Sequence, residues 1–164
     1  MIYKDIFAKL QEKNLEYLVV GGIAVNLHGY SRVTNDLDLL VLMDEKNIRK
    51  IVEAIKELGY KPRMPIDIND FISSENRTDW IENKNMKVFS VYNPKNELEV
   101  IDILLVYGLD FKEAYQNRES YNIGKIEIPT ISIPDLVKLK EEAGREIDKL
   151  DINVLKRIME LRNE

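Results

Sequence analysis

Cysteine is absent from this sequence, and histidine occurs only once, as His28. Without cysteine the chain can form no disulfide bond and perform no thiolate chemistry, which fits a cytoplasmic protein. A single histidine excludes a metal site built from several imidazoles and a nucleophile relay centred on histidine. We therefore expect His28 to be structural, with its ring bound to free backbone carbonyls at the end of a short helix.

Long apolar segments and an excess of positive charge are also missing. No run approaches the ~18 apolar residues of a membrane span, and the N-terminus lacks the basic-then-apolar pattern of a signal peptide. The 24 basic and 29 acidic residues give a net charge of −5, so the chain has no broad positive face for general nucleic-acid binding. No flexible linker divides the 164 residues. We expect a single cytoplasmic domain with no membrane partner.

Two glycines follow an apolar segment near the N-terminus. The residues Tyr17 to Val20 are typical of a short strand, and Gly21-Gly22 permits the unusual dihedrals and close backbone approach of a phosphate-binding turn. No helix breaker occurs from Ile23 to Leu27, which predicts a short helix with free N–H groups facing a bound phosphate. The G-x-G-x-x-G spacing of a dinucleotide-binding turn is absent. Gly21 and Gly22 are therefore candidate phosphate ligands through their backbone.

Three aspartates interrupt apolar strand patterns. Residues 36–43 predict a buried strand, on which Asp36 and Asp38 share one face because side chains at i and i+2 project the same way. In residues 97–106, Asp102 takes a position that the alternating pattern reserves for an apolar side chain. A lone buried carboxylate is costly, so it must be paired, protonated or bound to a metal ion.

The predicted strand pairing would bring these carboxylates together. Residues 86–92 and 97–106 are expected to form a hairpin, which would place Asp102 near the centre of the sheet. Each pair of carboxylates about 4 Å apart would repel by about 4 kcal/mol at an effective dielectric constant of about 20. Only a cation would make such a cluster stable. The trio therefore predicts a divalent-metal site, with three merely structural aspartates as the alternative.

Other polar residues are candidates for contacts at the rim of this site. Arg32 and Thr34 lie between the short helix and Asp36, where a cation and a hydroxyl could reach phosphates, although solvated loop residues explain them equally well. Residues 61–85 lack periodicity and predict a loop that overhangs the site. Its Arg77 and Trp80 could contact an acceptor or a base, but we favour Trp80 as an anchor of the loop on the core.

The C-terminal third begins with a helix start at Ser132, where a proline follows in the first turn and Asp135 completes a variant of the capping box. Lys140 then lies on the apolar face of that helix, where a lysine is costly unless it meets an anion. We therefore assign Lys140 to the wall of the cleft, facing phosphate. The apolar neighbours on this face are Leu136, Val137, Leu139 and Ala143.

A last helix is predicted from about Glu146, with Arg145 just before it. Its apolar stripe comprises Ile147, Leu150, Val154, Ile158 and Leu161. Asp151 lies on the same stripe and Asp148 beside it. We favour a mixed arrangement, in which Lys140 faces phosphate and Asp148 and Asp151 orient the basic groups. The alternative is that Lys140 or Arg145 simply neutralises Asp148 or Asp151 in a buried ion pair between helices.

Together these motifs resemble the DNA polymerase β-like nucleotidyltransferases, whose core has a Gly-Gly or Gly-Ser turn, an Asp-x-Asp pair and a third acidic residue on a later strand. The string from Gly21 to Asp38 is similar to the small prokaryotic branch that includes AbiEii-type abortive-infection toxins. The resemblance covers about the first two thirds of the chain. It implies an α+β fold with a small mixed twisted sheet flanked by helices, a core at about 1–130 and C-terminal helices at about 133–163.

The resemblance also implies the reaction, in which a nucleoside triphosphate gives its nucleoside monophosphate to an acceptor hydroxyl and releases pyrophosphate. Asp36 and Asp38 would hold Mg²⁺ on the triphosphate, and Asp102 would hold a second Mg²⁺ and help to activate the acceptor, with Mn²⁺ as an alternative metal. Many members carry serine where this chain has Gly22, so backbone amides alone would contact the phosphates. The full set of nucleotide-binding candidates is Gly21, Gly22, Arg32, Thr34, Lys140 and Arg145, with Asp148 and Asp151 in support.

These motifs do not identify the acceptor. Resemblance to the toxins implies RNA or a protein side chain as acceptor, with an antitoxin protein as partner. A small molecule such as an antibiotic is a second candidate acceptor within the same enzyme class. From a different class, the chain could be an inert nucleotide-binding regulatory module, although retention of all three aspartates argues against this.

Overall fold

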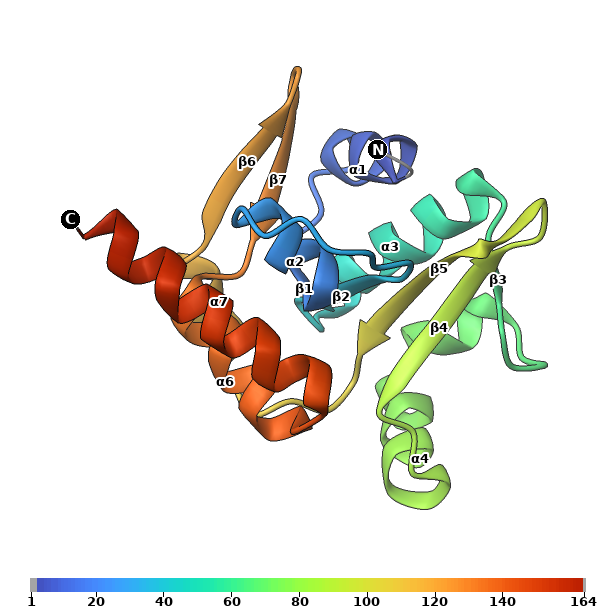
Figure 1. Cartoon of the computed structure of the whole chain (residues 1–164). Coiled ribbons are helices and arrows are strands. Elements are labelled where there is room, and N and C mark those ends of the chain that lie inside the picture. Colours follow the sequence, from blue (N-terminus) through green and yellow to red (C-terminus); the bar gives the residue numbers. More distant parts are fainter. Residues whose placement is uncertain (1–2, 164) are drawn as a thin grey trace.

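A computed structural model of the protein describes residues 3–163, which form a seven-stranded mixed sheet with helices around it (Figure 1). The sheet has the order β3-β4-β5-β2-β1-β7-β6, and the predicted α+β class is confirmed. The strands are β1 Tyr17–Val20, β2 Leu37–Val41, β3 Lys61–Pro62, β4 Val88–Asn93, β5 Asn96–Leu104, β6 Glu119–Ile123 and β7 Ile126–Thr130. The helices are α1 Lys4–Glu12, α2 Gly21–Leu27, α3 Glu45–Leu58, α4 Ser74–Lys84, α5 Phe111–Gln116, α6 Ile133–Ala143 and α7 Glu146–Arg162, and η1 Ile68–Ile72 is a 3₁₀ helix.

Strand β2 occupies the centre of the sheet, as its apolar sequence predicts. It runs antiparallel to β1 and parallel to β5. Its four apolar residues are fully buried, and Asp38 is the only member of the strand that is not. A strand buried on both faces needs apolar side chains on both, so a carboxylate at this position is a marked exception.

The helices position the second wall of the candidate site. Helix α2 lies against β1 and β2 and contacts α6, and α6 and α7 pack along each other beside it (Figure 1). Ser132 caps α6 as predicted, because its Oγ accepts a hydrogen bond from the Asp135 amide at 3.3 Å. Gly144 then ends α6 in the left-handed conformation, with φ of 63°, and reverses the chain into α7. No helix within residues 3–163 is long and apolar enough to cross a membrane.

The expectation of an irregular loop over residues 61–85 is wrong, because this segment contains β3, η1 and α4. Helix α4 is polar on nearly all sides and buries only Trp80, so it lacks the apolar periodicity that identifies a helix in a sequence. Ser73 marks its start by accepting a hydrogen bond from the Asn76 amide at 3.2 Å. A serine at this position is a typical helix N-cap, and it was the local sequence feature that could have indicated the start of α4.

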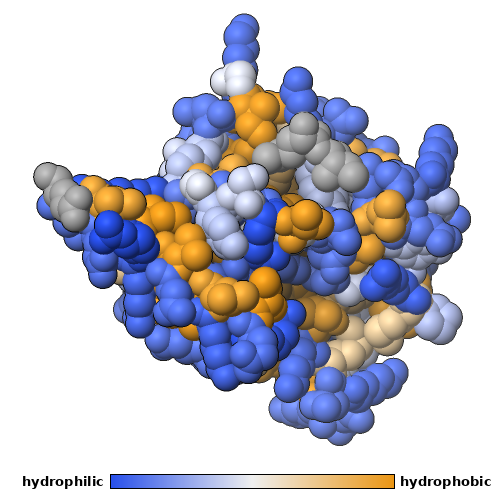
Figure 2. Space-filling model, viewed as in Figure 1, coloured by the Kyte–Doolittle hydropathy of each residue, from blue (hydrophilic) through white to orange (hydrophobic). Residues whose placement is uncertain are grey.

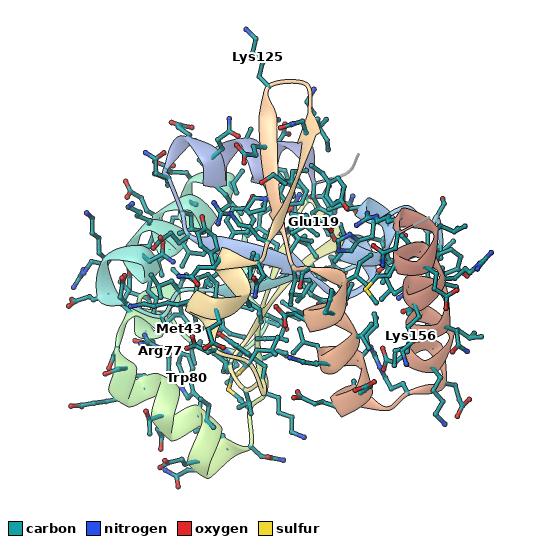
Figure 3. All side chains as sticks on the ribbon, turned by 90° about the vertical axis from the view of Figure 1, so that its left-hand side faces the viewer. Met43, Arg77, Trp80, Glu119, Lys125 and Lys156 are labelled. Carbon is teal, nitrogen blue, oxygen red and sulfur yellow. The ribbon has the colours of Figure 1, made fainter. Side chains whose placement is uncertain are left out.

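Trp80 anchors α4 on the core, in agreement with the favoured interpretation. Its ring packs in a cluster with Phe71 and Phe89, at centroid distances of 6.5 and 5.5 Å, and these two rings stack on each other at 4.6 Å. Arg77 donates from Nη1 to the carbonyls of Phe71 and Ile72 at 2.6 and 2.9 Å, and so satisfies the end of η1. Figure 3 shows Arg77 and Trp80 together where α4 meets the rest of the molecule. Both side chains therefore hold α4 in place.

Helix α7 presents a different face to the core from the one its apolar stripe predicts. Its buried residues are Asp148, Asp151 and Leu155, whereas Leu150 is 60 % exposed and Leu161 is 52 % exposed. Apolar side chains are visible along the outer side of α7 in Figure 2. The two aspartates make ion pairs with buried and half-buried cations, and this requirement sets the rotation of the helix.

The anchoring role of Trp80 leads to a stability prediction. Trp80→Ala removes the stacked ring and leaves a cavity, so we expect the free energy of unfolding to fall by about 3–5 kcal/mol. Urea denaturation followed by circular dichroism measures this change. Thr78→Ala, on the exposed side of the same helix, is the control and should change it by less than about 0.5 kcal/mol. Equal effects of the two substitutions would contradict the anchoring role.

Candidate active site

The two glycines between β1 and α2 are required by neighbouring side chains. Gly21 has φ of 66°, and a β-carbon there would overlap the Asp38 carboxylate. A β-carbon on Gly22 would overlap the Thr34 hydroxyl. The Gly-Gly turn thus lets a carboxylate from β2 lie directly against the backbone at the end of β1. This places the predicted phosphate turn and the predicted metal ligand side by side.

Asp38 and Asp102 are cross-strand partners on the neighbouring strands β2 and β5. Burial, followed by the charges of Asp102 and Asp36, raises the pKa of Asp38 to about 7. Burial and then the charge of Asp102 also raise the pKa of Asp36, which precedes β2, while Arg63 opposes the rise. The three predicted carboxylates therefore lie close enough to repel one another electrostatically.

The three carboxylates do not form a ready-made metal cage by themselves in the part of the chain that the structure describes. Among residues 3–163, no three acidic, histidine or cysteine side chains are arranged to hold a metal ion by themselves. Asp102 and Asp38 each contact a different group instead: Asp102 accepts a hydrogen bond from Ser90, and Asp38 lies against Gly21. Repulsion between the negative charges of Asp38 and Asp102 favours such separate contacts.

The donor chemistry of the site nevertheless fits Mg²⁺. This ion prefers oxygen ligands and commonly takes one or two carboxylates from the protein and the rest from water and substrate phosphates. Asp38 and Asp102 line one cavity, which supplies such a pair. The raised pKa of Asp38 records unfavourable negative charge that a cation would relieve. The structure therefore suits a metal ion shared between protein and triphosphate.

A cavity of about 270 Å³ lies between the sheet and the α6–α7 pair. The sheet side provides Gly21, Asp38 and Asp102, and the helical side provides Lys140 and Arg145. The remaining wall residues are Val20, Val88, Leu104, Leu136, Leu139, Ala143 and Asp148. Residues from three distant parts of the sequence thus meet at one site, with carboxylates on one wall and basic groups on the other.

The basic residues of this wall are held by buried aspartates. Lys140 is only 4 % exposed, and its Nζ lies 2.9 Å from Asp151 and 3.4 Å from Asp148. Arg145 donates to Asp148 from Nε at 2.8 Å and from its backbone amide at 3.1 Å. Burial alone would raise the pKa of Asp148, but the hydrogen bonds from Arg145 outweigh it and lower that pKa. Lys140 therefore combines the two predicted positions: it lines the cavity, and it makes buried ion pairs with Asp148 and Asp151.

Arg32 and Thr34 lie beside the cavity rather than in its wall. Arg32 makes a two-pronged contact with Asp151, from Nε at 2.9 Å and from Nη2 at 2.8 Å. Thr34 packs against Gly22. Their contact with phosphates stays a prediction, whereas their contacts with Asp151 and the Gly-Gly turn are direct.

Two polar residues have roles that the sequence interpretation missed or misplaced. Ser90 faces Asp102 across the β4–β5 hairpin, and the predicted pairing of these strands could have identified it.

His28 is structural but binds the carbonyl of Ile131 at 2.7 Å, not the carbonyls of its own helix. Because that carbonyl can only accept, Nε2 carries a proton, and Nδ1 lies 2.7 Å from the Tyr121 hydroxyl.

Comparison with solved structures identifies the fold. Lincosamide antibiotic adenylyltransferase LnuA, bound to lincomycin, superposes with a TM-score of 0.62 and 19 % identity, and the match covers 93 % of each chain. ANT(2")-Ia in complex with adenylyl-2"-tobramycin gives 0.55 and 16 %, over 99 % of this chain and 92 % of that one. An antigenic nucleotidyltransferase-like protein from Paracoccidioides brasiliensis gives 0.55 and 14 %, over 98 % and 74 %.

This chain has the nucleotidyltransferase fold. The likeness extends over nearly the whole chain, so it includes the α6–α7 pair as well as the sheet. No protein-family model matches the sequence, and no curated protein matches it either. The fold implied by the Gly-Gly turn and the aspartates is confirmed, and the narrower resemblance to the abortive-infection branch stays a prediction.

The raised pKa of Asp38 predicts how stability depends on pH without divalent metal. An unfolded chain releases this proton near pH 4, whereas the folded protein holds it up to about pH 7. The resulting stabilisation is complete below about pH 4 and is lost as the pH rises through about 7. We therefore expect the melting temperature of the wild type, relative to Asp38→Asn, to fall between about pH 4 and pH 7 and to level off above about pH 8.

Differential scanning calorimetry in EDTA measures this difference. Asp79→Asn, which changes an exposed aspartate on α4, is the matched control and should follow the wild-type profile. Parallel profiles of the wild type and Asp38→Asn would contradict the raised pKa.

The buried ion pairs of Lys140 lead to a further stability prediction. Lys140→Met leaves two buried aspartates with fewer compensating charges, so we expect it to lower the free energy of unfolding by about 3 kcal/mol in urea denaturation. Lys138→Met, on the exposed side of the same helix, is the control and should cost less than about 1 kcal/mol. A neutral effect of Lys140→Met would show that its ion pairs contribute little.

Proposed function

We propose that this protein is a metal-dependent nucleotidyltransferase, which transfers a nucleoside monophosphate from a nucleoside triphosphate to an acceptor hydroxyl. The observation that carries the proposal is the cavity in which Asp38 and Asp102 face Lys140 and Arg145. The fold supports it, because LnuA is an adenylyltransferase by name and ANT(2")-Ia was solved with an adenylylated product. A cavity with metal-binding oxygens on one side and cations on the other suits a triphosphate.

The donor half of the site follows from the placement of these groups. The backbone at Gly21 and Gly22 would contact the departing phosphates, with Lys140 and Arg145 opposite. Asp38 and Asp102, with Asp36 beside them, would hold Mg²⁺ or Mn²⁺. When bound, the metal neutralises charge on the phosphates and on the attacking and leaving oxygens, and two ions are expected from the resemblance.

The acceptor half centres on Asp102. In the reaction, the acceptor oxygen forms a bond to the α-phosphorus while the bond from that phosphorus to the β-phosphate oxygen breaks, and pyrophosphate leaves. Asp102 would receive the hydroxyl proton as general base. The hydrogen bond from Ser90 fixes the orientation of that carboxylate across the hairpin.

Two acceptor classes are supported by different observations. The sequence resemblance to AbiEii-type toxins favours RNA or a protein side chain, with an antitoxin as partner. The names of LnuA and ANT(2")-Ia, and their full-length match to this chain, favour a small-molecule acceptor. An inert nucleotide-binding regulatory module stays the alternative outside enzymes.

Label transfer tests the proposal directly. Each α-³²P-labelled NTP is incubated with the protein, Mg²⁺ and a cell extract, and the RNA, protein and small-molecule fractions are counted. We expect the wild type to transfer label and Asp102→Asn to lower the transfer at least about 100-fold, because both a metal ligand and the base are lost. The melting temperature of the variant without nucleotide reports whether it is folded. If the wild type labels no fraction with either Mg²⁺ or Mn²⁺, the inert module is supported.

A further inference from the structure

A second cavity adjoins the candidate active site. It measures about 680 Å³ and shares four wall residues with the first cavity, so the two lie side by side; the shared residues are Val88, Leu104, Leu139 and Ala143. Its other wall residues are Lys87, Val106, Tyr107, Gly108 and Glu142. We refer to the space lined by these nine residues as the outer pocket.

The order of strands places the outer pocket on one side of the carboxylates and the Gly-Gly turn on the other. Gly21 follows β1, Asp38 lies on β2, and Asp102 lies on β5, which are consecutive strands of the sheet. The next strand, β4, carries Val88, which pairs with Leu104 two residues beyond Asp102. The path from the phosphate turn therefore crosses Asp38 and Asp102 and then runs two residues along β5 to the outer pocket.

The geometry of phosphoryl transfer gives this order a chemical meaning. Attacking and leaving oxygens lie roughly in line on opposite sides of the reacting phosphorus. If pyrophosphate leaves toward the turn at Gly21 and Gly22, the acceptor oxygen approaches from the opposite side, past Asp102. The outer pocket begins at that side. This step rests on the proposed nucleotidyl transfer.

The walls of the outer pocket are apolar and carry almost no net charge. Its apolar residues are Val88, Leu104, Val106, Leu139 and Ala143, and Val106 is 51 % exposed. One lysine, Lys87, and one glutamate, Glu142, supply its charges. An RNA end would require several cations for its phosphates and aromatic faces for its bases, but Tyr107 is the only aromatic residue among the nine. The volume lies within the range of about 300–1,000 Å³ that is usual for small ligands.

Two polar groups could orient a ligand in this pocket. Glu142 accepts a hydrogen bond from the Gly108 amide at 3.3 Å, and its carboxylate lies against the backbone of Gly108. This contact places the carboxylate at the wall of the pocket. Tyr107 is half-buried and adds a hydroxyl that can donate or accept. A few polar groups on an apolar surface are typical of a small-molecule site.

We propose that the outer pocket binds the acceptor and that this acceptor is a small alcohol with a largely apolar body. Its hydroxyl reaches Asp102, and its apolar part lies against β4, the end of β5 and α6. The same pocket disfavours a polyanion such as RNA, because its walls carry no excess of positive charge.

The test uses Val106→Glu, which adds a charge to the outer pocket without touching the phosphate turn or the carboxylates. The acceptors are a panel of aliphatic, aromatic and amino alcohols, purified total RNA and extract protein, each with labelled NTP and Mg²⁺. We expect label on one or more alcohols and a fall in kcat/KM for them of about tenfold or more in Val106→Glu. Stabilisation of the protein by NTP with Mg²⁺, measured as a shift in melting temperature, should be unchanged.

Leu98→Glu is the matched control, because Leu98 is an exposed residue at the other end of β5. The Leu98→Glu variant should label the alcohols as the wild type does. Label on RNA or protein alone would overturn the acceptor assignment and leave the nucleotidyltransferase intact. Unchanged alcohol labelling in Val106→Glu would also overturn it. Absence of both label and stabilisation by NTP would instead overturn the proposed function itself.

Discussion

The ion pairs of Asp151 hold the two walls of the site together. This carboxylate is fully buried, and it binds Arg32 from the segment before β2 and Lys140 from α6. A buried charge left without partners is strongly destabilising, so these three residues have to meet in the folded protein. Their contact fixes the distance and orientation of the α6–α7 pair relative to β2.

The same ion pairs explain the orientation of α7 and the position of a lysine on the apolar face of α6. Helix α7 turns its acidic residues inward and leaves Leu150 and Leu161 exposed, because the buried Lys140 would otherwise lack a partner, and a buried charge without a partner is strongly destabilising. Lys140 can serve both structure and ligand, since an ammonium has three donors and lines the cavity while it contacts two aspartates. A structural ion pair and a phosphate contact are therefore compatible at this residue.

In the proposed reaction, Asp102 stands between a donor half at the first cavity and an acceptor half at the outer pocket. The donor half combines the Gly-Gly turn, the carboxylates and two cations, all of which suit a triphosphate with its metal ion. The acceptor half is shaped by β4, the residues after β5 and the outer side of α6. A shared fold specifies the first half more strongly than the second, because function depends on the side chains that each chain places on that fold.

The sequence by itself determined the parts of the molecule that depend on local patterns. The glycine pair, the apolar β2 with its single aspartate, the β4–β5 hairpin and the Ser132 cap could all be read from neighbouring residues. Helix α4 could not, since it is held by one tryptophan and has no apolar stripe. Tertiary structure alone decided the alignment of Asp38 with Asp102, the separation of the carboxylates and the rotation of α7. These features depend on where buried charges find partners from distant segments, and no local pattern contains that information.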